Sequence, residues 1–152
     1  MDFSLTNEQK MIIDTLKTFV EQELYPHEME VEKTNQIRPE LAAQIKQKAL
    51  DLGLYAANMP EEHGGAGLDT LTLCLMEREL GRANFGLQYI VARPSNILLA
   101  CKGDQIENYL LASIRGDKVD CLAMTEPNAG SDVRSMQCRA ERDGDGFVIN
   151  GT

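Results

Sequence analysis

Residues 6–24, TNEQKMIIDTLKTFVEQEL, decide the fold class of this chain. Thr6 and Gln9 have the spacing of a capping box, in which two polar side chains satisfy free N–H groups at the start of a helix. Apolar residues then recur every three or four positions, the period of one helix face: Ile12, Ile13, Leu16, Phe19, Val20 and Leu24. The pattern predicts a helix that ends at Pro26, because proline disrupts a helix interior.

A polar stretch, residues 27–36, separates this helix from a second one and is expected to be a loop or a short solvated helix. Pro39 suits the first turn of the second helix, and Gly53 suits the position after its end. The apolar face of that helix is expected to include Leu41, Ile45 and Leu52.

Three more helices are expected before residue 116. Residues 54–69 carry a proline and three glycines, which predicts a long loop ending at a helix cap, Asp69. A third helix should then run to Gly81, a fourth over residues 85–101 with Pro94 as a kink or early-turn residue, and a fifth over residues 104–115.

The pattern changes to that of a β structure near residues 116–118. Residues 119–124, VDCLAM, are predicted to form a strand, residues 136–142 alternate loosely, and Phe147–Ile149 is rich in β-formers. Asp143–Gly146, DGDG, is a strong hairpin signal. The expected fold class is therefore mainly α: a helical domain over residues 1–117, followed over residues 118–152 by the first strands of a β domain that the chain does not complete.

Composition narrows the possible functions. The chain has 152 residues, a net charge of −9 and 43% hydrophobic residues, so it can bury a core but lacks the basic surface that nucleic acid or an anionic membrane attracts. It shows neither a transmembrane stretch nor a secretory leader. Four cysteines without a CxxC pair indicate reduced thiols in a cytoplasmic protein rather than a zinc site: Cys74, Cys101, Cys121 and Cys138.

Residues 122–132, LAMTEPNAGSD, carry the clearest functional signal. Asn128 and Gly130 tolerate left-handed backbone, in which successive N–H groups can form an anion-binding nest. Thr125 and Ser131 offer hydroxyl groups, whereas Asp132 is expected to cap a backbone turn. Leu122 and Met124 could supply an apolar wall for a planar ligand. On residue types alone, a purely structural loop is the favoured interpretation.

The sequence LAMTEPNAGSDVRS, residues 122–135, resembles the signature of the acyl-CoA dehydrogenase family. The residues that match it without a gap are Met124, Thr125, Glu126, Ala129, Gly130, Ser131 and Asp132. Further resemblances follow in order along the chain: residues 5–26 to the first helix of the family, residues 53–69 to its Pro-Glu-Glu-x-Gly-Gly loop, residues 77–82 and 103–118 to later helices, and residues 146–152 to a strand near the flavin.

This resemblance implies an N-terminal helical domain, a β-barrel-like middle domain and a C-terminal four-helix domain, with FAD bound between the last two. It implies α,β-dehydrogenation of an acyl-CoA thioester, as in fatty acid metabolism. A carboxylate removes the α-proton, and a hydride passes to the flavin. Electron-transferring flavoprotein is the implied electron acceptor, and the full-length protein is implied to be a homo-tetramer.

The resemblance also assigns site residues. Thr125 is expected to hydrogen-bond the flavin ring, and Ser131 to reach the acyl-CoA substrate. The implied cofactor contacts are Leu122, Ala123, Met124, Thr125, Glu126, Pro127, Asn128, Ala129, Gly130 and Ser131. The catalytic glutamate of the family lies in the C-terminal domain, so no residue here inherits that role, and the 152-residue chain alone is expected to be inactive.

Several other residues have a simple structural interpretation. Glu126 is expected to pair locally, Glu77 and Glu79 to be solvated or salt-bridged, and Glu61–His63 not to bind a metal. A helix segment expected near the acyl chain is more simply explained as core: Tyr89, Ile90, Pro94 and Ile97.

Two alternative functions stay open from the sequence. One is a related acyl-CoA oxidase or nitroalkane-oxidase-like flavoenzyme. The other is a non-catalytic binding or assembly fragment, which flavin retention would distinguish.

Overall fold

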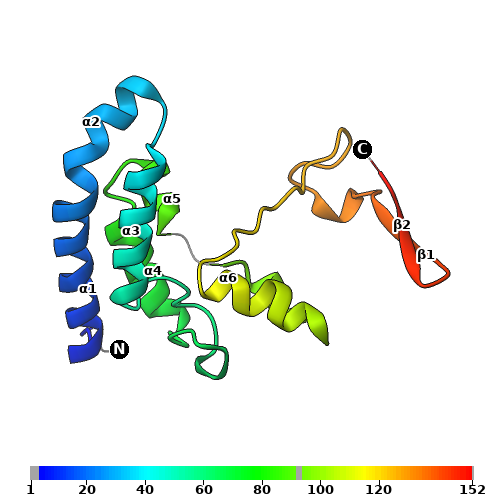
Figure 1. Cartoon of the computed structure of the whole chain (residues 1–152), viewed down its shortest axis with the longest axis horizontal. Coiled ribbons are helices and arrows are strands. Elements are labelled where there is room, and N and C mark those ends of the chain that lie inside the picture. Colours follow the sequence, from blue (N-terminus) through cyan, green and yellow to red (C-terminus); the bar gives the residue numbers. More distant parts are fainter. Residues whose placement is uncertain (1–3, 92–93, 152) are drawn as a thin grey trace. The chain divides into compact units, whose positions relative to one another are not determined.

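The computed structural model describes residues 4–91 and 94–151. The chain forms two compact units, Met1–Asp120 and Cys121–Thr152. The first unit is helical and the second contains a small antiparallel sheet (Figure 1).

Helix α1, Asn7–Phe19, begins as the sequence predicts. The Thr6 hydroxyl accepts a hydrogen bond from the Gln9 backbone N–H, and the Gln9 side-chain oxygen accepts one from the Thr6 N–H, both at 3.1 Å. This capping box fixes the phase of the helix, so that Ile13, Leu16 and Phe19 are buried.

The helical path continues past Pro26, so the predicted end at that residue is wrong. A π-helical turn, Val20–Leu24, leads directly into helix α2, Tyr25–Thr34. The Tyr25 N–H bonds the Val20 carbonyl five residues back, and Pro26 falls in the first turn of α2, where a missing N–H costs nothing. Of the two alternatives for residues 27–36, a helix is found, and it ends at Asn35 in left-handed conformation (φ 51°).

Helix α3, Pro39–Asp51, confirms the second predicted helix. Leu41 and Ile45 are buried, together with Ala49. The assignment of Leu52 to the apolar face is wrong: it is 53% exposed, because it lies after the last turn.

The loop after α3 is tightly packed. It contains a 3-10 turn, Glu61–His63, and buries Met59 completely. A Cβ built on Gly65 would lie 2.1 Å from the Met59 carbonyl oxygen, so glycine is required there for close backbone approach.

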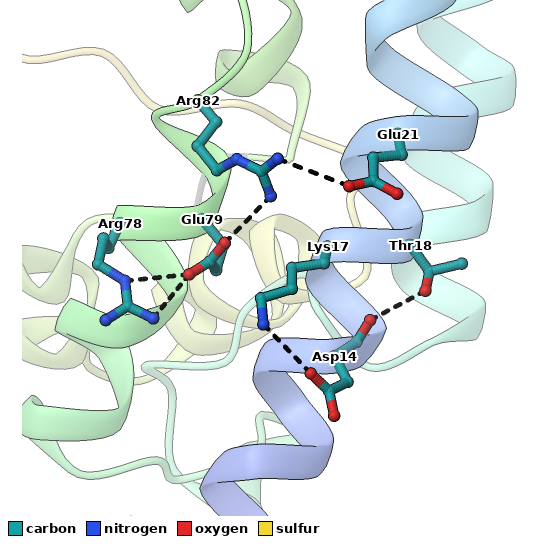
Figure 2. A network of polar contacts seen from close by, with 7 residues as sticks. All are labelled: Asp14, Lys17, Thr18, Glu21, Arg78, Glu79 and Arg82. Atoms are coloured by element: carbon teal, nitrogen blue, oxygen red, sulfur yellow. Dashed lines mark hydrogen bonds and ion pairs between the residues drawn. The ribbon is translucent and has the colours of Figure 1, made fainter.

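Helix α4, Thr70–Leu80, starts at the predicted cap, where Asp69 accepts hydrogen bonds from the Thr72 N–H (3.0 Å) and hydroxyl (2.7 Å). Its buried face packs against α1 (Figure 1). A polar contact joins the segments that follow these two helices: the Arg82 guanidinium, just after α4, lies 3.5 Å from the carboxylate of Glu21 in the π-helical turn after α1 (Figure 2).

The predicted continuous fourth helix is wrong. Helix α5, Phe85–Ile90, is short and is followed by a 3-10 turn, Asn96–Ala100. Pro94 cannot donate to a preceding helical turn, and the Ser95 hydroxyl caps the new turn by accepting from the Ile97 N–H at 3.4 Å.

The fifth helical segment is present as a π-helical stretch, Ile106–Leu111, followed by α6, Ala112–Ile114. Leu110 and Ile114 are buried, as their helical spacing predicts. Gly116, with φ of 79°, ends it.

In the second unit, strands β1, Arg139–Asp143, and β2, Gly146–Asn150, pair antiparallel with Arg139 opposite Asn150. The predicted hairpin turn is confirmed, with Gly144 in left-handed conformation (φ 59°). The predicted strand over residues 119–124 is wrong: within the described residues it has no paired neighbour, and a strand requires one to satisfy its backbone hydrogen bonds.

Candidate functional site

The loop that carries the family signature is built around a tight turn at Glu126–Ala129. The Glu126 N–H donates to the Ala129 carbonyl at 3.0 Å, and the Ala129 N–H donates to the Glu126 carbonyl at 3.1 Å. Ala129, at the end of this turn, is buried.

The Glu126 carboxylate fastens the turn to the residues before β1. Its two oxygens accept hydrogen bonds from the backbone N–H groups of Gln137 at 2.7 Å and Cys138 at 2.8 Å. Both oxygens are therefore engaged by the local backbone, as expected of a structural acid, and the side chain is not arranged to remove a proton from a substrate.

Asp132 caps the next turn, as predicted. Its carboxylate accepts from the Arg134 N–H at 3.2 Å and from the Ser135 hydroxyl at 2.6 Å, at the start of the 3-10 turn Val133–Ser135. The acid thus stabilises the far end of the signature loop.

The backbone of the loop differs from the left-handed nest that the sequence suggested. Neither Asn128 nor Gly130 is among the described residues with positive φ. The reciprocal hydrogen bonds of the Glu126–Ala129 turn hold this backbone in place without left-handed residues.

Donors and apolar surface suited to a planar ligand remain on the loop. Among residues 121–151, no protein group bonds the hydroxyls of Thr125 and Ser131. Leu122 is 69% exposed and Met124 is about half exposed. These two free hydroxyl groups beside exposed apolar side chains suit a ligand such as a flavin, whose surface is partly polar and partly apolar. The other predicted contacts, Ala123, Pro127 and Asn128, are exposed on the same loop.

The helical unit contains a cavity of about 350 Å³. Its walls come from α3, from the loop after α3, from α5 and from the end of the unit. The side chains that give it chemical character are Lys46, Tyr55, Tyr89, Ile90, Ser95 and Asp120.

Only part of the segment considered for acyl binding lines this cavity. Tyr89 and Ile90 do, whereas Pro94 is fully buried and Ile97 is 67% exposed. Sequence reasoning missed Asp120, although an acid inside the apolar run VDCLAM was the available signal.

Tyr55 is the most buried polar side chain of the cavity, at 8% exposure. The Lys46 ammonium lies 5.5 Å from its ring centroid and donates to the Gly116 carbonyl at 2.6 Å. Burial, then the nearby Asp120 carboxylate and Tyr89, raise the pKa of Tyr55, so its hydroxyl stays protonated at neutral pH.

Glu79 is buried in a separate polar network (Figure 2). Its carboxylate accepts from Arg78 at 2.7 and 3.0 Å and from Arg82 at 3.3 Å. Burial alone would raise the pKa of Glu79, but these hydrogen bonds and positive charges lower it below its usual value. The network joins α4 to Glu21 and is structural, as the sequence interpretation expected.

No three metal-ligating side chains converge anywhere in residues 4–91 and 94–151. His63 lies 3.8 Å from Glu62 and belongs to no larger cluster of that kind. A helix with the length and apolarity to span a bilayer is likewise missing from these residues.

Known proteins match both the sequence and the fold. A profile of the acyl-CoA dehydrogenase N-terminal domain matches residues 6–117. A probable acyl-CoA dehydrogenase, YngJ of Bacillus subtilis, is 36% identical over 99% of this chain and 40% of its own length.

Two solved structures agree. Butyryl-CoA dehydrogenase from Megasphaera elsdenii superposes with a TM-score of 0.76 at 28% identity, over 99% of this chain and 41% of that one. Acyl-CoA dehydrogenase complexed with FAD from Bacillus anthracis gives 0.76 at 28% identity, over 97% of this chain and 26% of that one. The chain thus spans about two fifths or less of these relatives. It belongs to the acyl-CoA dehydrogenase family, and its helical unit is the N-terminal domain of that family.

Proposed function

We propose that this chain is the N-terminal part of an FAD-dependent acyl-CoA dehydrogenase that introduces an α,β double bond into an acyl-CoA thioester. The observation that carries the proposal is the signature loop, residues 122–131, with its fixed Glu126–Ala129 turn and its unpaired hydroxyls. We assign residues 118–152 to the beginning of the FAD-binding middle domain and residues 1–117 to the helical domain.

The loop residues would hold one side of the flavin. Thr125 would donate its hydroxyl hydrogen to the ring system, and Leu122 and Met124 would cover its apolar surface. Glu126 holds the loop in shape through the N–H groups of Gln137 and Cys138, so that the ring meets a fixed surface. Bound FAD supplies the capacity to accept a hydride from the substrate.

Each of the two units, taken by itself, offers a candidate contact for the substrate. Ser131 would bond the acyl-CoA, while Tyr89 and Ile90 would receive the acyl group. The base that removes the α-proton would come from a C-terminal domain, since each acid of the signature loop is engaged by backbone N–H groups. The isolated chain is accordingly expected to lack activity.

Electron-transferring flavoprotein is the proposed electron acceptor. A homo-tetramer in the cytoplasm is the proposed state of the full-length protein. These assignments follow the family resemblance and add no further role for the residues described above.

Flavin titration of the chain tests the proposal. FAD fluorescence quenching should saturate, and Thr125→Val should weaken binding about three- to tenfold, because one hydrogen bond to the ring is lost. Thr34→Val, on α2 in the helical unit, is the matched control and should leave affinity unchanged. No quenching at any concentration would contradict a flavin contact by this chain alone, and equal affinity of both variants would contradict the role of Thr125.

A further inference from the structure

The cavity of the helical unit has an unusual polar end. Asp120 and Tyr55 both line it, and the pKa of Tyr55 is raised by burial first and by the negative charge of Asp120 second. Ala42, Ala43 and Ile90 make the remaining wall apolar. A ligand that fills this space therefore meets an apolar body and a polar end.

The polar end has spare hydrogen-bonding capacity. Among the described residues, Asp120 has no ion-pair partner, and its carboxylate accepts only a long hydrogen bond from the Ser95 N–H, at 3.3 Å. Within residues 4–91 and 94–151, the Tyr55 hydroxyl forms no hydrogen bond to a protein group. A half-buried carboxylate with free lone pairs is stabilised by a donor, and an apolar ligand would leave it without one.

Lys46 restricts which donor fits. Its ammonium lies against the Tyr55 ring and is held by the Gly116 carbonyl at the same cavity. Either charged ligand group would be attracted by one of these two side chains and repelled by the other: an ammonium by Asp120 and Lys46 respectively, a carboxylate by Lys46 and Asp120 respectively. A neutral hydroxyl avoids both repulsions, because it can donate to Asp120 and accept from the Tyr55 hydroxyl, which is protonated.

We infer that this cavity selects an acyl group that ends in a hydroxyl, held between Asp120 and Tyr55. The inference rests on the proposed function, in which the cavity receives the acyl group. The volume of about 350 Å³ is near the lower limit of small-molecule sites, roughly 300–1,000 Å³, and favours a short acyl group. Asp120 and Tyr55 are thus specificity-determining residues rather than catalytic ones.

The test uses the 152-residue chain and three N-acetylcysteamine thioesters: hexanoyl, 6-hydroxyhexanoyl and 5-carboxypentanoyl. Binding is measured by calorimetry and by NMR shifts of residues around Tyr55. The hydroxyl-ended probe should bind about tenfold more tightly than the methyl-ended one, as expected for a hydrogen bond to a charged group. The carboxyl-ended probe should bind most weakly.

Two variants and one control sharpen the result. Asp120→Ala and Tyr55→Phe should each remove most of the hydroxyl preference while keeping affinity for the methyl-ended probe. Asp104→Ala, at an exposed acid outside the cavity, should retain the preference. Circular dichroism confirms that each variant is folded.

Each alternative outcome has a definite meaning. Equal binding of the methyl- and hydroxyl-ended probes, or an unchanged preference in Asp120→Ala, would overturn the inference while leaving the proposed function intact. Tightest binding of the carboxyl-ended probe would overturn it in favour of Lys46 as the selecting group. Binding of no probe would overturn it as well, while the separate flavin titration would still decide whether the signature loop holds FAD.

Discussion

Replacing Leu16 by alanine should destabilise the helical unit severely, because this side chain has no exposed surface. It belongs to the same core cluster as Phe19, Ile45 and Met76, which come from helices α1, α3 and α4. The change removes three carbon atoms, which at about 0.8 kcal/mol each amounts to a transfer term of roughly 2.4 kcal/mol. The cavity left behind adds to this, so the free energy of unfolding should fall by about 3–5 kcal/mol.

Urea titration followed by circular dichroism at the helical band measures this loss. The midpoint should move to lower urea with an unchanged slope, because the surface exposed on unfolding is almost the same. Met11→Ala is the control: it lies on the same helix but is 71% exposed, and it should cost less than about 0.5 kcal/mol. A loss below about 1 kcal/mol for Leu16→Ala, or equal losses for both variants, would refute the helix phase that the Thr6 capping box sets.

Three further predictions concern other parts of the chain. Gly65→Ala should lower the free energy of unfolding, measured by urea titration, by about 1–3 kcal/mol or more, because its Cβ would overlap the Met59 carbonyl. Gly130→Ala, with open space around it, is the control and should be nearly neutral. Equal effects of the two changes would contradict the close approach at residue 65. Glu79→Gln should remove a pH-dependent part of the stability. Because the pKa of Glu79 is lowered in the folded chain, its contribution is present above the ordinary glutamate pKa and is lost as pH falls through the lower, folded-state pKa. The variant should therefore lose less stability between about pH 5 and pH 3 than the unmodified chain. If the free energy of unfolding of the variant and of the unmodified chain changed with pH in parallel, this role of Glu79 would be contradicted. Glu126→Ala should shift the amide NMR signals of Gln137 and Cys138 upfield, because both lose a carboxylate acceptor, and should weaken FAD binding several-fold; unchanged signals would show that the two hydrogen bonds do not form in solution.

The sequence predicted most of what depends on local chemistry. The caps at Thr6 and Asp69, the turn at Gly144 and the turn at Asp132 all appear where side-chain hydrogen bonds or glycine conformations require them. Such features depend on a few neighbouring residues, so a single sequence contains the information.

The errors arise where a distant partner decides the outcome. Residues 119–124 have strand-forming side chains, but a strand exists only if another strand pairs with it. Pro94 divides the expected fourth helix, although its effect could equally have been a kink. At the candidate site, the signature singled out residues 122–132, but only coordinates could bring Lys46, Tyr55 and Asp120 together around one cavity.

The π-helical turn at Val20–Leu24 has a consequence for how this helix tolerates changes in length. Such a turn accommodates one residue more than a regular helix does, and each residue rotates the following side chains by about 100°. Deleting one residue between positions 20 and 24 would restore a regular helix but turn Val31 away from the core. Inserting an alanine into the regular segment 7–19 would misdirect the same side chain. The number of residues between the Thr6 cap and Val31 is therefore fixed by the structure. Within the family, insertions and deletions should be absent from this segment and tolerated in the exposed turn after α2.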